Sequence, residues 1–345
     1  MEISSNVPLA DLSTMHLGGQ AAHLATVTTR MELLEALSWA QNHDNLPVIM
    51  IGVGSNVIWR DAGFVGLVIV NKIERYEVFE EDELNVYVTV GSGENWENVV
   101  ARTVEAGYSG IEALSLIPGS AGATPIQNVG AYGQEISNVL VTIEAFDTQA
   151  GDFVTIPVTD CGFGYRHSRF NTTDRGRFYI TGITLHLTKN NPEPPFYAAL
   201  QTYFTDNKIT NYTASAVRQA VIAIRSAKLP DPSTIHNTGS FFANPIVDQV
   251  VINNLSFKYG KIPYWSVGGG TFKLSAAWLI QQAGYKDFHD PETGMGTWPA
   301  QPLVLVNESA KTTADLLKFK QKIVDAVQVK FSITLVQEPE LLPQI

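Results

Sequence analysis

The chain has 345 residues, a formal net charge of −11 and a single cysteine, and 45% of its residues are hydrophobic against 17% charged. This composition is typical of a globular protein of two or three domains and excludes a disordered chain, because it can build more than one apolar core. It disfavours a nucleic-acid surface, which needs clustered Lys and Arg, and a thiolate zinc site or disulfide framework, which needs several cysteines.

Neither a signal peptide nor a membrane span is expected. Residues 1–20 lack a basic start followed by an apolar stretch, and no uncharged apolar run reaches the roughly 18–20 residues that span a bilayer. We therefore expect a soluble, cytoplasmic protein with no membrane or nucleic-acid partner.

The first elements predicted along the chain are a helix and two strands that flank a glycine-rich turn. Thr29 and Glu32 have the spacing of a capping box, and the helix that they open should end near 42–44. The apolar run 48–51 then predicts a strand, and 67–71 predicts another. No helix is expected between them, which excludes a Rossmann or P-loop site, because both place a helix directly after the glycine-rich turn.

Further along, extended and helical patterns follow one another. Strands are expected at 86–90, at several places between about 139 and 187, most clearly at 182–187, and at about 331–336. Helices are expected at 96–104, 215–227, 273–283, and after the capping pair Thr312 and Asp315. Residues 111–133 should be rich in loops, and 190–195 should form a turn or linker.

Two glycine-rich segments carry chemical information. The first, IGVGSN at 51–56, leaves a run of backbone N–H groups bare for phosphate oxygens, although a tight turn between strands explains it equally well. The second, IPGSAGATPIQNVGAYG at 117–133, has four glycines, three alanines and few charges, which suits backbone that lies against a flat ring or a diphosphate. A loop packed between domains is the alternative for this second segment.

These two segments belong to a set of six motifs that makes the sequence recognisable. The others are FGYRHS (163–168), KLPDP (228–232), NTGSFFANP (237–245) and KLSAAWLIQQAG (273–284). From Thr14 to Glu340 the chain resembles the type I members of the UDP-N-acetylenolpyruvoylglucosamine reductase (UDP-N-acetylmuramate dehydrogenase) family. Members of this family are flavoenzymes of peptidoglycan precursor synthesis.

The resemblance implies an α+β fold with an FAD-binding part of the vanillyl-alcohol-oxidase type. Residues 1–70 with 329–345 would form one FAD-binding subdomain, 71–220 a second, and 221–328 a substrate-binding domain. FAD is the implied bound cofactor and NADPH the implied co-substrate, with no metal. The implied reaction reduces UDP-N-acetylglucosamine enolpyruvate to UDP-N-acetylmuramate, a step that supports cell-wall biogenesis, cell shape and cell division. We expect a monomer.

The resemblance also implies which residues contact the cofactor. They come from the two glycine-rich segments: Ile51, Gly52, Val53, Gly54, Ser55, Asn56, Ile117, Pro118, Gly119, Ala123, Thr124, Gln127, Asn128, Gly130, Ala131 and Tyr132. Some members have a serine near the flavin N5 where this chain has Ala123, so a contact there would come from the backbone or from Thr124.

Three residues match the family's catalytic positions. Arg166 carries a permanent charge that can pair with a carboxylate, although a single Arg is more often part of a surface ion pair. Ser240 matches the proton donor to the enol, with a turn or a helix N-cap before Phe241 as the alternative. Glu340 matches the catalytic carboxylate, and Glu338, two residues earlier on the same face of a strand, is the alternative.

The resemblance implies six residues that bind the UDP-sugar: Tyr165, Tyr197, Arg225, Lys228, Asn244 and Lys273. Tyr197 matches a tyrosine that closes over the UDP-sugar, although its neighbours differ from the family pattern. For Lys228, a solvated charge at a helix C-terminus is an alternative. His167 is expected to be a bystander, with electrostatic tuning of Arg166 as the alternative, and Cys161 is expected to be a small buried residue.

Two other functions are alternatives to this reaction. One is an FAD-dependent alcohol or sugar oxidoreductase on the same fold, which NTGSFF and KLPDP disfavour because they resemble the reductase's substrate domain. The other is a UDP-sugar-binding protein without catalysis, which the retention of Arg166, Ser240 and a terminal Glu disfavours.

Overall fold

The computed structural model describes residues 1–344, apart from the side chains of 79 and 80, and divides the chain into two compact units. Unit 1 comprises Met1–Val7, Ala21–Val53 and Phe64–Ala227, and unit 2 comprises Pro8–Gln20, Gly54–Gly63 and Lys228–Ile345. The glycine-rich segment 51–56 therefore contributes to both units. The division into three domains that the resemblance implies stays a prediction.

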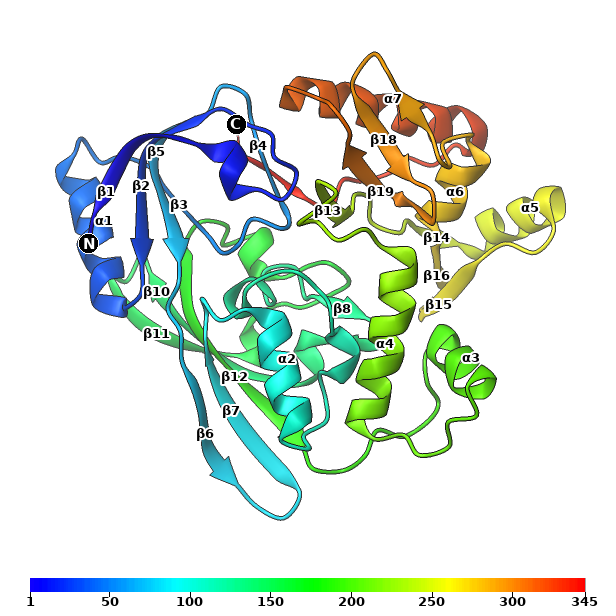
Figure 1. Ribbon diagram of the computed structural model, residues 1–345, viewed down its shortest axis with the longest axis horizontal. Helices are drawn as coiled ribbons and strands as arrows, with labels where there is room; N and C mark the ends of the chain where they lie inside the picture. Colours follow the sequence, from blue (N-terminus) through cyan, green and yellow to red (C-terminus); the bar gives the residue numbers. More distant parts are fainter. Residues whose placement is uncertain (345) are drawn as a thin grey trace. The chain divides into compact units, whose positions relative to one another are not determined.

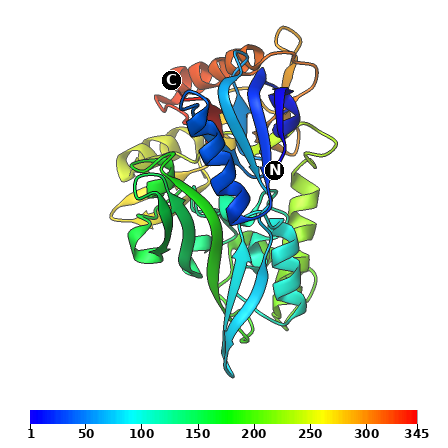
Figure 2. The ribbon, with the colours of Figure 1, turned by 90° about the vertical axis from the view of Figure 1, so that its left-hand side faces the viewer.

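The first sheet of unit 1 is covered by one helix. Its strands, in spatial order, are β1 (Ile3–Pro8), β2 (Gln20–Val27), β5 (Phe64–Asn71) and β3 (Val48–Ile51). The helix α1 (Arg30–Asn42) lies against these strands (Figure 2). Its residues Leu33, Ala36 and Ala40 are buried in the core that it shares with them. The absence of a helix between β3 and β5 is confirmed, since only the short strand β4 (Val57–Trp59) lies there.

The predicted cap of α1 is present, in a modified form. The Thr29 hydroxyl accepts a hydrogen bond from Glu32 N at 3.1 Å. The Glu32 carboxylate accepts from the N–H and hydroxyl of Thr28, at 2.6 and 2.7 Å. These bonds lower the pKa of Glu32, and they satisfy N–H groups that a helix start leaves without intrahelical partners.

The second sheet of unit 1 is antiparallel, with α2 (Trp96–Glu105) against it (Figure 1). Its strands, in spatial order, are β11 (Asp152–Pro157), β10 (Leu140–Asp147), β12 (Phe178–Thr188), β7 (Asn85–Gly91) and β6 (Tyr76–Glu81). The predicted helical stripe of Trp96, Val99, Val100 and Val104 is buried in this core. The strands with alternating apolar residues thus form one layer, and α2, with its apolar residues at helical spacing, forms a second layer against it, as expected.

The rest of unit 1 consists of short elements and two helices. The short elements are η2 (Glu112–Leu114), η3 (Ala121–Ala123), β8 (Gly130–Ala131), β9 (Gln134–Glu135), η4 (Ile136–Asn138), η5 (Val158–Asp160) and η6 (Arg169–Asn171). The helix α4 (Ala214–Lys228) confirms the prediction, whereas α3 (Ala198–Asp206) was not predicted. Leu200 and Phe204 of α3 pack with Val217 and Val221 of α4, so tertiary contacts stabilise this short helix.

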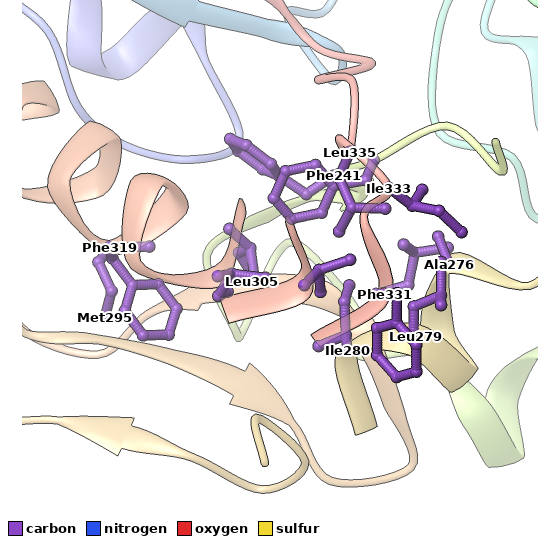
Figure 3. Close-up of a cluster of buried hydrophobic side chains, with 14 of the residues drawn as sticks. Phe241, Ala276, Leu279, Ile280, Met295, Leu305, Phe319, Phe331, Ile333 and Leu335 are labelled. Atoms are coloured by element: carbon purple, nitrogen blue, oxygen red, sulfur yellow. The ribbon is translucent and has the colours of Figure 1, made fainter. Parts of the chain in front are cut away.

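The described residues of unit 2 form three sheets and three α-helices. Its first sheet runs β13 (Asn237–Ser240), β19 (Gln301–Asn307), β18 (Met295–Trp298), β17 (His289–Asp290), and its second β14 (Ile246–Asp248), β16 (Thr271–Leu274), β15 (Tyr264–Gly268). The other elements are η1 (Leu9–Leu12), α5 (Gln249–Tyr259), α6 (Ala276–Gln282), α7 (Thr313–Phe331) and β20 (Glu340–Leu342), which pairs with β4. Figure 3 shows the core, where Phe241, Leu305 and Phe319 come from the segment after β13, from β19 and from α7.

Two predictions in unit 2 are wrong, one about a helix boundary and one about a strand. The helix expected at 273–283 begins only at Ala276, because Lys273 pairs with Ile246 and Trp265 in a sheet and the Ser275 hydroxyl caps α6. The strand expected at 331–336 is absent as well. α7 continues through Phe331, and the last strand is β20.

Among residues 1–344, no helix combines the length and apolar character needed to cross a bilayer.

Candidate functional site

The two glycine-rich segments predicted to hold the cofactor, 51–56 and 117–133, contact each other in unit 1 through Gly52 and Ser120. A Cβ on Gly52 would lie 2.0 Å from Ser120 Oγ, and a Cβ on Gly122 would lie 2.4 Å from Ser92 Cβ. Ala121 N and Gly122 N donate to the carbonyls of Glu94 and Ser92, each at 2.9 Å. Glycine is therefore required at both positions for packing, and the 120–122 backbone is held rigidly on the turn after β7.

These segments fit a planar cofactor with a diphosphate. Backbone without projecting side chains lets a ring or a phosphate approach closely, and the contact between Gly52 and Ser120 aligns the two segments. Thr124, the residue suggested for a contact near Ala123, is 3% exposed, and its hydroxyl donates to Ala121 O at 2.7 Å. As that donor is in use, the hydroxyl can meet a ligand only as an acceptor.

Arg166 lies at a tight turn in the same unit. Gly164 and His167 exchange backbone hydrogen bonds of 3.0 and 3.2 Å, and Arg166 between them has φ 54°. Its Nη2 donates to Gly130 O at 3.1 Å, within the second glycine-rich segment, and its guanidinium lies 5.2 Å from the centre of the Tyr165 ring. The structure thus places a permanent cation at the predicted cofactor segment.

Arg225 forms a partly buried polar cluster with Tyr132. The Arg225 Nη2 donates to Leu116 O at 3.1 Å, and Tyr132 hydrogen-bonds to Arg225. Burial lowers the pKa of Arg225 and raises that of Tyr132, while each partner opposes the shift of the other. Tyr197, just before α3, meets the Tyr132 ring edge-on at 5.8 Å between centroids, and burial raises its pKa too.

An ion pair that the sequence analysis missed supports this cluster. Arg218 Nη2 lies 2.6 Å from Glu97 Oε1, and Glu97 Oε2 accepts from Leu116 N at 2.5 Å. Leu116 thereby connects α2 to α4, with Glu97 on its N–H and Arg225 on its carbonyl. Neither charged residue belongs to a motif, so only their tertiary pairing identifies them.

In unit 2, Ser240 ends β13. It pairs with Val304 of β19, and Gly239 before it has φ 70°. No helix directly follows Ser240, so the N-cap alternative is wrong. Thr14 Oγ1 and Thr238 Oγ1 are buried without a hydrogen-bond partner in the described part of the chain, and the two segments join through Asn237 N and Thr14 O at 3.0 Å. Buried hydroxyls of this kind normally bond to a water or a ligand, and Thr238 lies two residues before Ser240.

Glu340 and Glu338 occupy different structural positions. Glu340 begins β20, where its N–H donates to Asn56 O at 2.9 Å, whereas Glu338 lies before this strand and its N–H donates to Phe241 O, also at 2.9 Å. The expectation that both share one strand face is therefore wrong. Glu340 is joined to the first glycine-rich segment, within the part that belongs to unit 2.

Three other predicted substrate residues, Lys228, Asn244 and Lys273, lie in unit 2. Lys228 is exposed at the end of α4. Asn244 Oδ1 accepts from Ala276 N at 2.9 Å, at the start of α6. Lys273 lies in β16 between Ile246 and Trp265. The segments of Asn244 and Lys273 are neighbours, since Leu274 N donates to Pro245 O at 2.9 Å, and the roles of all three residues stay predictions.

Comparison with known families agrees with this arrangement. Residues 21–156 match a family model described as an FAD binding domain, and residues 231–342 match the C-terminal domain of UDP-N-acetylenolpyruvoylglucosamine reductase. The protein is thus an α+β flavoprotein with a distinct C-terminal domain, which confirms the expected fold class and FAD as its cofactor.

Relatives extend the match to the whole chain. UDP-N-acetylenolpyruvoylglucosamine reductase of Amoebophilus asiaticus is 39% identical over 99% of both chains, and that of Alcanivorax borkumensis is 39% identical over 97% of this chain and 95% of its own. The solved structure of the Thermus caldophilus reductase, 23% identical, has a TM-score of 0.68 and covers 99% of this chain and 100% of its own. The chain belongs to the UDP-N-acetylenolpyruvoylglucosamine reductase family.

Proposed function

We propose that this protein reduces the enolpyruvyl group of UDP-N-acetylglucosamine enolpyruvate with NADPH as the source of electrons. Family membership supports the reaction. The fit of the two glycine-rich segments to a planar cofactor with a diphosphate supports FAD as the carrier of the electrons. FAD held by the segments 51–56 and 117–132 would supply hydride transfer from NADPH to the terminal carbon of the enolpyruvyl group. The remaining steps fall to side chains.

Arg166 holds the substrate carboxylate. Negative charge develops on this side of the double bond as the hydride adds, and a guanidinium that stays protonated stabilises it. The hydrogen bond from Arg166 Nη2 to Gly130 O supports this role, because it holds the cation at a cofactor segment.

Ser240 gives the proton to the adjacent carbon. A serine hydroxyl is a weak acid, so the transfer needs a short path and stabilisation of the resulting alkoxide. Glu340 supplies the catalytic carboxylate. Its backbone lies in β20, where its N–H donates a hydrogen bond to Asn56 O. Ser240 sits on a paired strand and Glu340 on another, and a rigid backbone suits groups that must be placed precisely.

The UDP-sugar is held by Tyr165, Tyr197, Arg225, Lys228, Asn244 and Lys273. Arg225 is the best supported of these, because its Nε is buried without a hydrogen-bond partner in the described part of the chain. Lys228 is exposed and can meet a phosphate as a point charge. We further propose that the protein acts as a cytoplasmic monomer.

The placement of Arg166 at the cofactor segment is the observation that carries this proposal. The proposed reaction is tested by following its two half-reactions separately through the stopped-flow absorbance of the flavin. Ser240→Ala should keep flavin reduction by NADPH within about twofold and slow reoxidation by the enolpyruvyl UDP-sugar by roughly 10²–10⁴-fold.

The matched control is Ser215→Ala, an exposed serine on α4, which should leave both rates unchanged. Equal slowing of both half-reactions in Ser240→Ala would contradict the proton-donor role. Reoxidation by an alcohol in place of the UDP-sugar would favour an oxidase on the same fold.

A further inference from the structure

The turn that carries Arg166 has a conformation that its own sequence does not favour. Arg166 has φ 54°, a region that glycine adopts easily and side chains with a Cβ avoid. Gly164 and His167 close the turn through two backbone hydrogen bonds. A non-glycine residue stays in this region only where its surroundings hold it there. The groups that hold it therefore determine where the guanidinium points.

Asn128 holds the first corner of this turn. It is 1% exposed, and its Nδ2 donates to Gly164 O at 3.1 Å and to Glu135 Oε2 at 2.9 Å. Its Oδ1 accepts from Ser137 N at 3.2 Å. Two acceptors face one end of the amide and a donor faces the other, so these partners determine its orientation. Both donors of the amide are used, and any cofactor contact of Asn128 through a donor would have to come from its backbone.

Asn171 and Gly130 hold the other sides. Asn171 Nδ2 donates to Arg166 O at 3.1 Å, and Asn171 Oδ1 accepts from Ser168 N at 2.9 Å as part of a capping box on η6. The carbonyl of Gly130 accepts from the guanidinium itself. The turn is thus bonded at its entry, at its exit and at the charged end of the side chain.

We propose that Asn128 is a positioning residue for Arg166: its amide holds Gly164 so that the guanidinium is presented from a left-handed backbone beside the second glycine-rich segment. This inference rests on the proposed role of Arg166 in the reaction. Asn128 acts through the turn: both donors of its amide are used within the protein, so its expected contact with the cofactor comes from its backbone, which a substitution of the side chain leaves in place.

The test is Asn128→Asp, which keeps the shape and removes both donors. The new carboxylate faces Gly164 O and the Glu135 carboxylate without a proton to share, so the turn should loosen and stability should fall. Asn128→Asp combined with Glu135→Gln restores one of the two bonds, since the amide introduced at position 135 can donate to the carboxylate introduced at position 128. The double variant should regain stability while the bond to Gly164 stays absent.

The first readout is hydrogen exchange of the FAD-loaded protein, which does not depend on activity. In the double variant the amide of His167, which bonds to Gly164 O, should exchange about tenfold faster than in the wild type. Asn71→Asp is the matched control, because Asn71 is also buried in unit 1 and uses both donors, on Ser92 Oγ and Ile180 O. It should not change exchange at 163–168.

The second readout is the pair of half-reactions. The double variant should bind FAD stoichiometrically and be reduced by NADPH within about twofold of the wild type, while reoxidation by the enolpyruvyl UDP-sugar slows by about 10²-fold and the KM for this substrate rises. Unchanged exchange at His167, or activity lost only in proportion to lost FAD, would overturn the proposal. If the UDP-sugar fails to reoxidise the wild-type flavin, the proposed function is wrong, and the exchange result still decides the role of Asn128 in the turn.

Discussion

The close packing of Gly52 on Ser120 makes Gly52→Ala a direct test of the cofactor segments. The added Cβ would lie 2.0 Å from Ser120 Oγ and 3.0 Å from Ser120 Cβ, so one segment must move. Gly52 does not have a positive φ, so alanine brings no backbone strain and the effect is steric. Overpacking of this kind costs about 1–3 kcal/mol. If the cofactor requires the native spacing, its Kd rises by about 5- to 150-fold.

A double-mutant cycle isolates this contact. Ser120→Gly removes both clashing atoms, so Gly52→Ala with Ser120→Gly should recover most of the FAD affinity, with a coupling energy of about 0.5–3 kcal/mol. The measurements are titration of the apoprotein with FAD by flavin fluorescence and the midpoint of urea unfolding for each variant. Wild-type affinity in Gly52→Ala would refute the reasoning, as would a double variant no better than Gly52→Ala.

Three further predictions follow from other contacts. Gly54→Ala should reduce stability more than Gly52→Ala does, by about 2–4 kcal/mol in urea unfolding, because Gly54 has φ 71° and its Cβ would meet the backbone oxygen of Leu12 at 2.0 Å, which no side-chain substitution can relieve. Hydrogen bonds from Arg177 lower the pKa of Asp147 to about 2. The stability that this pair contributes is therefore complete above the unfolded-state pKa of about 4 and is lost as the pH falls from 4 towards 2. Asp147→Asn should make the midpoint of urea unfolding less dependent on pH across this range, and an unchanged dependence would contradict the assignment. Burial raises the pKa of the Cys161 thiol to about 11, so iodoacetamide at pH 8 should label it only as fast as the protein opens, and rapid labelling of the native protein would show that it is accessible.

Local chemistry explains the elements that the sequence predicted correctly. Thr312 and Asp315 form a complete capping box at the start of α7. Trp96 and Val100 lie on the buried face of α2, as their spacing indicates. In each case the deciding contacts join residues that are three or four apart, so the same pattern has the same meaning in many folds.

The errors arise where distant strands decide the local structure. Lys273 begins an apolar pattern with helical spacing, and yet it pairs with Ile246 and Trp265 in a sheet. At the other end of unit 2, Ile333 and Leu335 are buried in the core without forming a strand. Burial of alternate residues is common to strands and extended loops, and only a hydrogen-bonding partner separates the two.

The motifs by themselves identified the family and FAD as the cofactor, because glycine-rich backbone that approaches a cofactor leaves a signature in residue type and spacing, and the assignment of FAD to the two glycine-rich segments stays a prediction. Only the tertiary structure decided how Arg166 is held: Asn128, 38 residues before it in the chain, bonds to Gly164 at the start of its turn, and Asn171, five residues after it, bonds to its carbonyl. A side-chain amide has the same letter in the sequence whether it holds a ligand or a turn. Which of the two it holds depends on the acceptors that the fold brings to it.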